Sequence, residues 1–324
     1  MPAPPMPTPR HVETNGIRMA VYEAGEGFPV VLLHGWPELA FSWRHQIPAL
    51  AAAGYRVIAP DQRGYGLTDR PERVEDYDME HLTGDLVGLL DALGLDHAVF
   101  VGHDWGGLLG WQLPLLHRER VAGVIGVNTP FLPRLPLEPI GMLRFAFGER
   151  MYIVWFQDSD GADRALERDP RRVFRTIMRT PAITNEQFVA LPPEARRFDF
   201  IQQFDEPEPE ALGGEPLLDE EELAFFAETY ERTGFTGGIN WYRNLTRNWR
   251  ASEGLAQRVE VPALMLSGKE DLVLPPALAN GMEGYVPDLE KHVIDDCGHW
   301  TQQERPEQLN RLMIDWLRRR FPSS

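Results

Sequence analysis

The sequence predicts an α/β protein, with helices on both sides of a mostly parallel central sheet, and three observations support this prediction. Short apolar runs alternate with amphipathic runs at helical spacing over residues 11–129. The same alternation returns over residues 251–324. Such an alternation is typical of parallel strands joined by right-handed helical crossovers. Between these parts, residues 130–250 contain no comparable apolar strand, so a helical insertion is expected there.

The chain begins with a predicted hairpin. Asn15-Gly16 divides residues 11–24 into two strand-like runs, and Asn-Gly is a strong hairpin signal. The apolar runs Pro29–Leu33 and Tyr55–Ala59 have the composition of strands that are buried on both faces. The spacing of apolar residues between them predicts a helix over Ser42–Ala53.

The remaining elements continue the same alternation. The periodicity predicts, in chain order, a helix Met79–Leu93, strands His97–Val101 and Val121–Asn128, helices Arg171–Arg179 and Glu221–Thr233 within the insertion, strands Pro262–Ser267 and Glu290–Ile294, and a closing helix Pro306–Arg320. The insertion therefore follows the sixth predicted strand.

One turn in this pattern is the candidate for a catalytic site. Gly102 ends a strand and Gly106 opens a helix, and residues without a Cβ allow the two backbones to approach closely. Asp104 lies between them. A carboxylate on such a turn is a candidate nucleophile that attacks through oxygen. The alternative is that Asp104 only caps the helix, since Asp is favoured at that position.

Two more polar residues follow predicted strands. Asp271 comes shortly after Ser267, and His299 follows the strand that ends near Asp295. Loops that follow parallel strands open at the same end of a sheet, so these side chains are expected to meet Asp104. The order nucleophile, acid, base is also the order described for α/β-hydrolases. We therefore predict a triad in which Asp271 orients His299.

The turn His34-Gly35-Trp36-Pro37 follows another strand at this end of the sheet. Its tight geometry would leave the backbone N–H of Trp36 free to point at the site. Together with the N–H of Trp105, it could form an oxyanion hole. In this reading His34, Gly35 and Pro37 form the structural motif that positions the turn. The alternative is an ordinary turn that contains proline.

Composition limits the classes of partner. The 324 residues carry a net charge of −17, which disfavours nucleic acid and anionic membranes. The stretch Asp205–Glu222 has nine acidic residues and no Lys or Arg, which is typical of a solvated loop. Cys297 is the single cysteine and fits a reducing compartment, so a cytoplasmic location is expected. Residues 1–10 contain five prolines and are expected to form an extended tail, not a signal peptide. No apolar run reaches membrane-spanning length.

These motifs together resemble the soluble epoxide hydrolases of the α/β-hydrolase fold, over nearly the whole chain after residue 10. The resemblance is to bacterial-type members, without the N-terminal phosphatase domain of some animal members. It divides the chain into a core, residues 11–129 and 251–324, and a helical cap, residues 130–250. The segments that carry it are His34–Pro37, Gly102–Gly107, Lys269–Asp271, Asp296–Gln302, Met151–Gln157 and Asn240–Asn244.

The resemblance implies roles for two tyrosines and a reaction in two steps. Tyr152 and Tyr242 would hold the epoxide oxygen while Asp104 attacks a ring carbon, and His299 would then activate water to hydrolyse the ester. It implies a small epoxide and water as the only partners, with no metal or organic cofactor, and leaves open a homo-oligomer. It also implies a cis peptide bond between Trp36 and Pro37.

Two other functions share these residue types. A haloalkane dehalogenase also uses an Asp nucleophile followed by Trp, here Trp105, but often has Asn after the His-Gly pair, where this chain has Trp36. A ligand-binding receptor could keep the pocket without catalysis, although the complete set of catalytic residue types argues against it. A fluoroacetate dehalogenase would need Arg at the position of Trp105.

Overall fold

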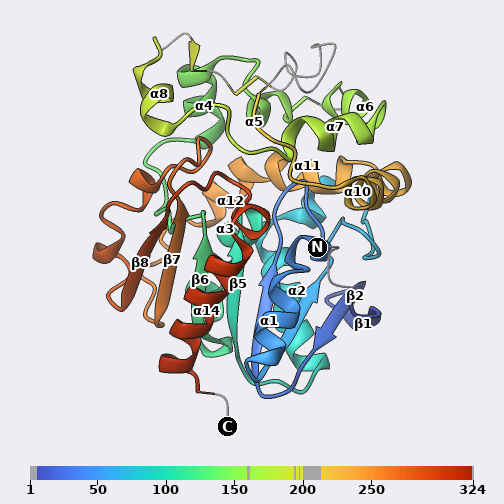
Figure 1. The fold of residues 1–324 in the computed structure, drawn as a ribbon, viewed down its shortest axis with the longest axis vertical. Helices are drawn as coiled ribbons and strands as arrows, with labels where there is room; N and C mark the ends of the chain where they lie inside the picture. The colour runs from blue at the N-terminus through green and yellow to red at the C-terminus, as the bar shows by residue number, and fades with distance from the viewer. Residues whose placement is uncertain (1–5, 159–160, 193–194, 197, 200–212, 323–324) are drawn as a thin grey trace.

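A computed structural model of the chain describes residues 6–158, 161–192, 195–196, 198–199 and 213–322. Its centre is an eight-stranded sheet in the order β1-β2-β4-β3-β5-β6-β7-β8 (Figure 1). The β1–β2 and β2–β4 pairs are antiparallel and the other pairs are parallel. The strands are β1 Arg10–Thr14, β2 Ile17–Ala24, β3 Phe28–Leu33, β4 Tyr55–Pro60, β5 Ala98–His103, β6 Val121–Val127, β7 Ala263–Gly268 and β8 Leu289–Ile294.

Helices cover both faces of the sheet, as the sequence predicts. Val99 and Val101 of β5 pack in one apolar cluster with residues of α1 and α14, whereas Phe100 packs in the other cluster with residues of α2 and α3. This division follows from the alternation of side chains along a strand. The bounds of these helices are α1 Gln46–Ala52, α2 Met79–Ala92, α3 Trp105–Leu116 and α14 Pro306–Arg320, with the short α13 at Thr301–Glu304.

The helix predicted over Ser42–Ala53 starts later than expected. Residues Ala40–Trp43 form a separate 3-10 turn, and α1 begins only at Gln46. Pro48 explains the difference, because proline has no N–H and is tolerated only in the first turn of an α-helix. A helix that began at Ser42 would place Pro48 in its interior.

The predicted helical insertion is also present. The described residues between β6 and β7 form eight helices and no named strand. Figure 1 shows most of these helices gathered over one end of the sheet. They are α4 Pro139–Phe147, α5 Tyr152–Trp155, α6 Gly161–Glu167, α7 Pro170–Ile177, α8 Asn185–Ala190, α10 Glu220–Thr233, α11 Thr236–Arg243 and α12 Leu245–Ala251.

The acidic stretch and the N-terminal segment are each described only in part. Residues 205–212 of the acidic stretch lie outside the described residues. Its last three residues lie in α10, which begins at Glu220, one residue before the predicted helix Glu221–Thr233. Asp219 caps α10 in a capping box with Glu222, because carboxylates are stabilised at a helix N-terminus. The buried Glu222 also pairs with Arg44 of the core, N to O, at 2.7 Å. At the N-terminus, residues 1–5 lie outside the described part, and Arg10 already pairs with Val21.

None of the helices in the described ranges combines the length and the apolar character that crossing a membrane requires.

Candidate active site

Asp104 lies on a sharp turn between β5 and α3. Its backbone has φ 49° and ψ −120°, a conformation that non-glycine residues rarely adopt. The predicted close approach of backbones is present, since a Cβ on Gly102 would collide with the Gly106 carbonyl, and one on Gly106 with the Leu33 carbonyl. The Asp104 side chain makes no capping hydrogen bond to α3. Its Oδ1 instead accepts from the backbone N–H of Trp36 at 2.8 Å.

The structure brings Asp271 and His299 to the same place. Asp271 follows β7 and His299 follows β8, at the carboxyl ends of neighbouring parallel strands. His299 Nδ1 lies 2.9 Å from Asp271 Oδ2, and His299 Nε2 lies 4.0 Å from Asp104 Oδ2. The imidazole therefore stands between two carboxylates, with one of its nitrogens facing each.

The charges of these three groups depend on one another. Burial alone would lower the pKa of His299, but the carboxylates of Asp271 and Asp104 outweigh it and raise this pKa to about 9. Burial would raise the pKa of Asp271, but His299 and hydrogen bonds hold it below its ordinary value. Burial does raise the pKa of Asp104, and His299 offsets this only in part. At neutral pH the imidazole of the free protein is therefore a cation.

The backbone at His34–Pro37 is arranged as the sequence predicts. The Trp36–Pro37 peptide bond is cis, and the resemblance implied this isomer. His34 is buried and its Nε2 accepts from the N–H of Gln62, while the N–H of Gly35 donates to Glu38. The N–H of Trp36 donates to Asp104.

A second backbone N–H acts on the same carboxylate. The N–H of Trp105, as well as that of Trp36, stabilises the ionised form of Asp104 and lowers its pKa against the effect of burial. The structure thus brings both predicted N–H donors to Asp104.

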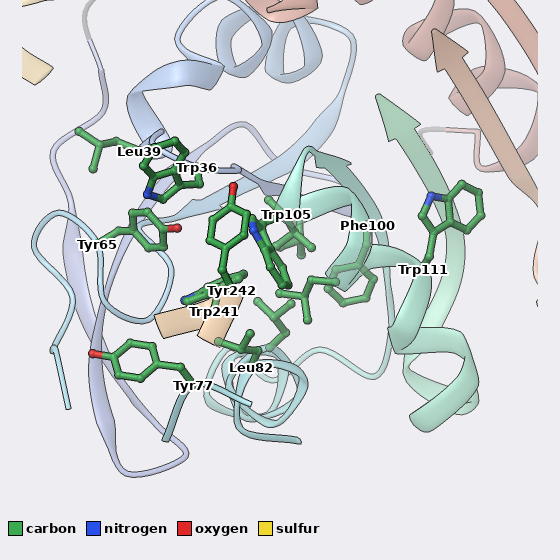
Figure 2. Packing of buried hydrophobic residues seen from close by; sticks show 14 of the residues in the cluster. Trp36, Leu39, Tyr65, Tyr77, Leu82, Phe100, Trp105, Trp111, Trp241 and Tyr242 are labelled. Atoms are coloured by element: carbon green, nitrogen blue, oxygen red, sulfur yellow. The ribbon is translucent and has the colours of Figure 1, made fainter. Parts of the chain in front are cut away.

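Tyr152 and Tyr242 come from the insertion and meet beside Asp104. Tyr152 opens α5, Tyr242 lies in α11, and their ring centroids are 5.9 Å apart. The exposed fraction is only 7% for Tyr152 and 3% for Tyr242. Figure 2 shows Tyr242 between Trp36 and Trp105, whose ring centroids lie 5.8 and 5.0 Å from its own. Burial and the Asp104 charge raise the pKa of both phenols, so they stay protonated.

Two cavities meet at Asp104. One of about 260 Å³ reaches past Trp36 and His299 to the loop that follows α7, and the other, of about 280 Å³, extends along Trp105 towards α4. The lining residues that they share are Asp104, Tyr152, Phe198, Tyr242 and Val273. A ligand can therefore reach the carboxylate with substituents on both sides of its reacting centre.

Three side chains near the triad were missed by the sequence analysis. Asn128 donates through Nδ2 to Asp271 Oδ2 at 2.8 Å, and His103 Nδ1 lies 2.7 Å from the buried Glu38. His103 Nε2 also lies 2.7 Å from the carbonyl oxygen of His299. Asn128 had a usable signal, since it ends a predicted strand at the edge of the sheet where Asp104, Asp271 and His299 lie.

The described residues contain no group of three or more His, Cys, Asp and Glu side chains that could hold a metal ion.

Comparisons with known proteins agree with this geometry. A family model described as "alpha/beta hydrolase fold" matches residues 29–306. Epoxide hydrolase A of Mycobacterium tuberculosis is 46% identical, over 96% of this chain and 97% of the relative. Bifunctional epoxide hydrolase 2 of Sus scrofa is 40% identical, over 93% of this chain but 53% of the longer relative.

Solved structures give the same result. The crystal structure of Epoxide Hydrolase A from Mycobacterium thermoresistibile is similar with a TM-score of 0.87 and 44% identity, covering 96% of this chain and 98% of the other. Epoxide hydrolase VrEH1 from Vigna radiata follows with a TM-score of 0.83 and 35% identity, covering 96% and 98%. The identities and the coverage are high enough to decide the family: this chain belongs to the epoxide hydrolases of the α/β-hydrolase fold.

Proposed function

We propose that this protein adds water to an epoxide and releases a vicinal diol through a covalent ester on Asp104. The observation that carries the proposal is the position of Asp104. Its Oδ1 is held by a backbone N–H, and its Oδ2 lies 4.0 Å from His299 Nε2 in a cavity that two neutral phenols also line. The relationship to proteins named as epoxide hydrolases supports the same reaction.

In the first step, Asp104 Oδ2 attacks a ring carbon from the side opposite the ring oxygen. The carbon–oxygen bond of the ring breaks as the ester bond forms, and negative charge develops on the departing oxygen. Tyr152 and Tyr242 donate hydrogen bonds to that oxygen, which becomes a hydroxyl by taking up the proton that the His299 imidazolium releases once the Asp104 charge is lost. Neutral phenols in a buried site suit this task, because donors that are already oriented stabilise a developing alkoxide more strongly than water does.

In the second step, water attacks the carbonyl carbon of the ester. His299 Nε2 takes a proton from that water, and Asp271 stabilises the imidazolium that forms. The charge that develops on Oδ1 is held by the N–H groups of Trp36 and Trp105. Collapse of this intermediate expels the second diol oxygen, which takes the proton held by His299 as the diol leaves. The proton left on the Asp104 carboxyl then passes to His299, which restores the carboxylate and the imidazolium of the free enzyme.

The same scheme gives the helical insertion a role. We propose that residues 130–250 form a cap over a core of residues 11–129 and 251–324. Tyr152 and Tyr242 come from the first segment, whereas Asp104, Asp271 and His299 come from the core. On this division, the cap supplies the donors for ring opening and the core supplies the groups that make and hydrolyse the ester.

Formation of the ester on Asp104 should change the charge of His299. The Asp104 carboxylate helps to raise the His299 pKa to about 9 in the free enzyme, and esterification removes that charge. Because the acid form of His299 cannot take a proton from water, ester hydrolysis should rise with pH to a plateau. We expect its midpoint to lie below 9. Single-turnover rates across pH would measure this midpoint, and NMR titration would measure the pKa of His299 in the free enzyme.

A matched control exists for this pH dependence. The Asp104→Ala variant lacks this carboxylate even though no ester forms. The pKa of His299 measured by NMR titration should therefore be lower in the variant than in the parent protein. Equal midpoints near 9 in the parent, the variant and the kinetic profile would contradict the charge change.

Loss of either cap phenol should slow ring opening. Tyr152→Phe and Tyr242→Phe should each lower the alkylation rate on the order of 10²-fold, the scale for removal of one oxyanion-type donor. The rate of ester hydrolysis should change little, because the phenols act on the departing oxygen only. The double variant should be nearly inactive on epoxides. Stopped-flow single-turnover fluorescence would resolve the two steps.

Tyr77 provides the control for these variants. It is 1% exposed, and its hydroxyl donates to the carbonyl of Pro71, outside the cavities that meet at Asp104. Tyr77→Phe removes a buried phenol hydroxyl in the same way but should leave alkylation unchanged. Normal alkylation by the Tyr152 and Tyr242 double variant would remove these residues from the mechanism. Assays of diol from a styrene-type epoxide and of halide from a haloalkane would then compare the epoxide reaction with dehalogenation.

A further inference from the structure

We infer that Glu304 is a positioning residue for His299, which it holds in place through the backbone on both sides. This inference rests on the proposed function. Glu304 Oε2 accepts from the N–H of Gly298 at 2.8 Å, and its Oε1 accepts from the N–H of Trp300 at 3.0 Å. One carboxylate thus bonds to the residues immediately before and after the catalytic base.

Other contacts hold the same loop from different directions. The carbonyl of Gly298 accepts from Asn128 Nδ2 at 3.1 Å. The indole N–H of Trp300 donates to the carbonyl of Ile177, at the end of α7, at 2.7 Å. Asn128 bonds to the carbonyl of Gly298, and Ile177 bonds to the side chain of Trp300. Glu304 instead accepts from the backbone N–H groups of both residues. Removal of Glu304 would therefore leave two donors near the base without their acceptor.

The second step of the reaction gives this arrangement its importance. His299 Nε2 stands 4.0 Å from Asp104 Oδ2, and the attacking water must fit between the imidazole and the ester carbonyl. A displacement of about 1 Å in such a site can lower a rate by about 10²-fold. Ring opening does not need His299 as a base, so it is less sensitive to the same displacement.

Glutamate fits this position better than its amide. A carboxylate has two acceptor oxygens and no donor, whereas glutamine has one acceptor oxygen and an NH₂ group. In Glu304→Gln, one of the two backbone N–H groups would face another donor. Burial raises the pKa of Glu304 and the His299 cation opposes this, so the Glu304 charge and the protonated imidazole favour each other. The substitution should therefore lower the pKa of His299 as well as loosen its loop.

A purely structural role is the competing explanation. Glu304 ends α13 and bonds back to Trp300, which precedes that helix, so it also stabilises a helix start. Glu138 also stabilises a helix start, since its carboxylate accepts from the N–H groups of Ile140 and Gly141 at the start of α4. Glu138→Gln is therefore a matched control that removes a similar pair of bonds far along the chain from the base.

The test is stopped-flow single-turnover kinetics with a styrene-type epoxide across pH. Glu304→Gln should slow ester hydrolysis about 10²-fold, leave alkylation near the parent rate and move the hydrolysis midpoint to lower pH. Glu304→Asp keeps the charge on a shorter arm and should give an intermediate hydrolysis rate. Glu138→Gln should leave both steps unchanged.

Each other outcome has a defined meaning. Normal hydrolysis by folded Glu304→Gln, or equal slowing of both steps with an unmoved pH midpoint, would overturn the positioning role. If Glu304→Gln does not fold, Glu304→Asp decides by the same criterion of selective slowing. If the parent enzyme forms no ester, the proposed function fails instead, and the failure is visible before any Glu304 variant is compared.

Discussion

Asp104→Ala should form no diol above the uncatalysed rate while it keeps the fold of the parent protein. Loss of the nucleophile removes the first step entirely, and removal of a catalytic nucleophile lowers turnover by 10⁴-fold or more, on the order of 10⁶-fold in the best-studied case. The turn should tolerate alanine, because its close backbone approach depends on Gly102 and Gly106 and not on the Asp104 side chain. Diol assay with a styrene-type epoxide and circular dichroism would measure activity and fold together.

Asp315→Ala is the matched control for this variant. Asp315 is exposed on α14, away from the cavities that meet at Asp104, so its loss should change neither diol formation nor the fold. Diol formation by Asp104→Ala near the parent rate would remove Asp104 as the nucleophile. A folded protein without activity would agree with the role proposed for this carboxylate.

His299→Gln should stop the reaction after the ester has formed. The Asp104 carboxylate remains able to open the ring, but no base remains to take a proton from the hydrolytic water, so the ester should accumulate. Intact mass spectrometry after addition of epoxide should show one substrate mass added to the protein. Peptide mapping should place that mass on the segment that contains Asp104.

His292 supplies the comparison for the histidine variant. It is exposed on β8, seven positions before the base, and His292→Gln should turn over epoxide without accumulating an adduct. Normal turnover by His299→Gln would contradict the two-step scheme. An adduct on any residue other than Asp104 would contradict the assigned nucleophile.

Much of this site follows from local sequence patterns. Asp104, Asp271 and His299 each follow a recognisable strand, and parallel strands bring such positions to one edge of the sheet. The convergence of these three side chains could therefore be predicted without coordinates, whereas their catalytic roles stay predictions. Roles for Tyr152 and Tyr242 came only from the family resemblance, because an aromatic residue in a helical segment has no pattern that separates catalysis from packing. A cytoplasmic location and a homo-oligomer stay predictions.

The parts that could not be predicted depend on contacts between distant segments. Asn128 reaches Asp271 across 143 positions of sequence, and His103 reaches Glu38 across 65. No periodicity encodes such pairs. The acidic stretch illustrates the same limit, since Glu222 is buried and pairs with Arg44, while Glu220 pairs with Arg171. Composition describes the average environment of a charge run and misses the members that find partners.

The backbone of Asp104 has a consequence for the evolution of this enzyme. A residue held at φ 49° and ψ −120° costs about 1–3 kcal/mol, in a protein class whose net stability is about 5–15 kcal/mol. Burial of its charge adds a further cost, as the raised pKa indicates. Glycine would relieve the backbone strain at this position, and any uncharged residue would avoid the cost of burying a charge. Heat resistance and turnover therefore favour different residues at position 104, and selection for turnover is what retains aspartate there.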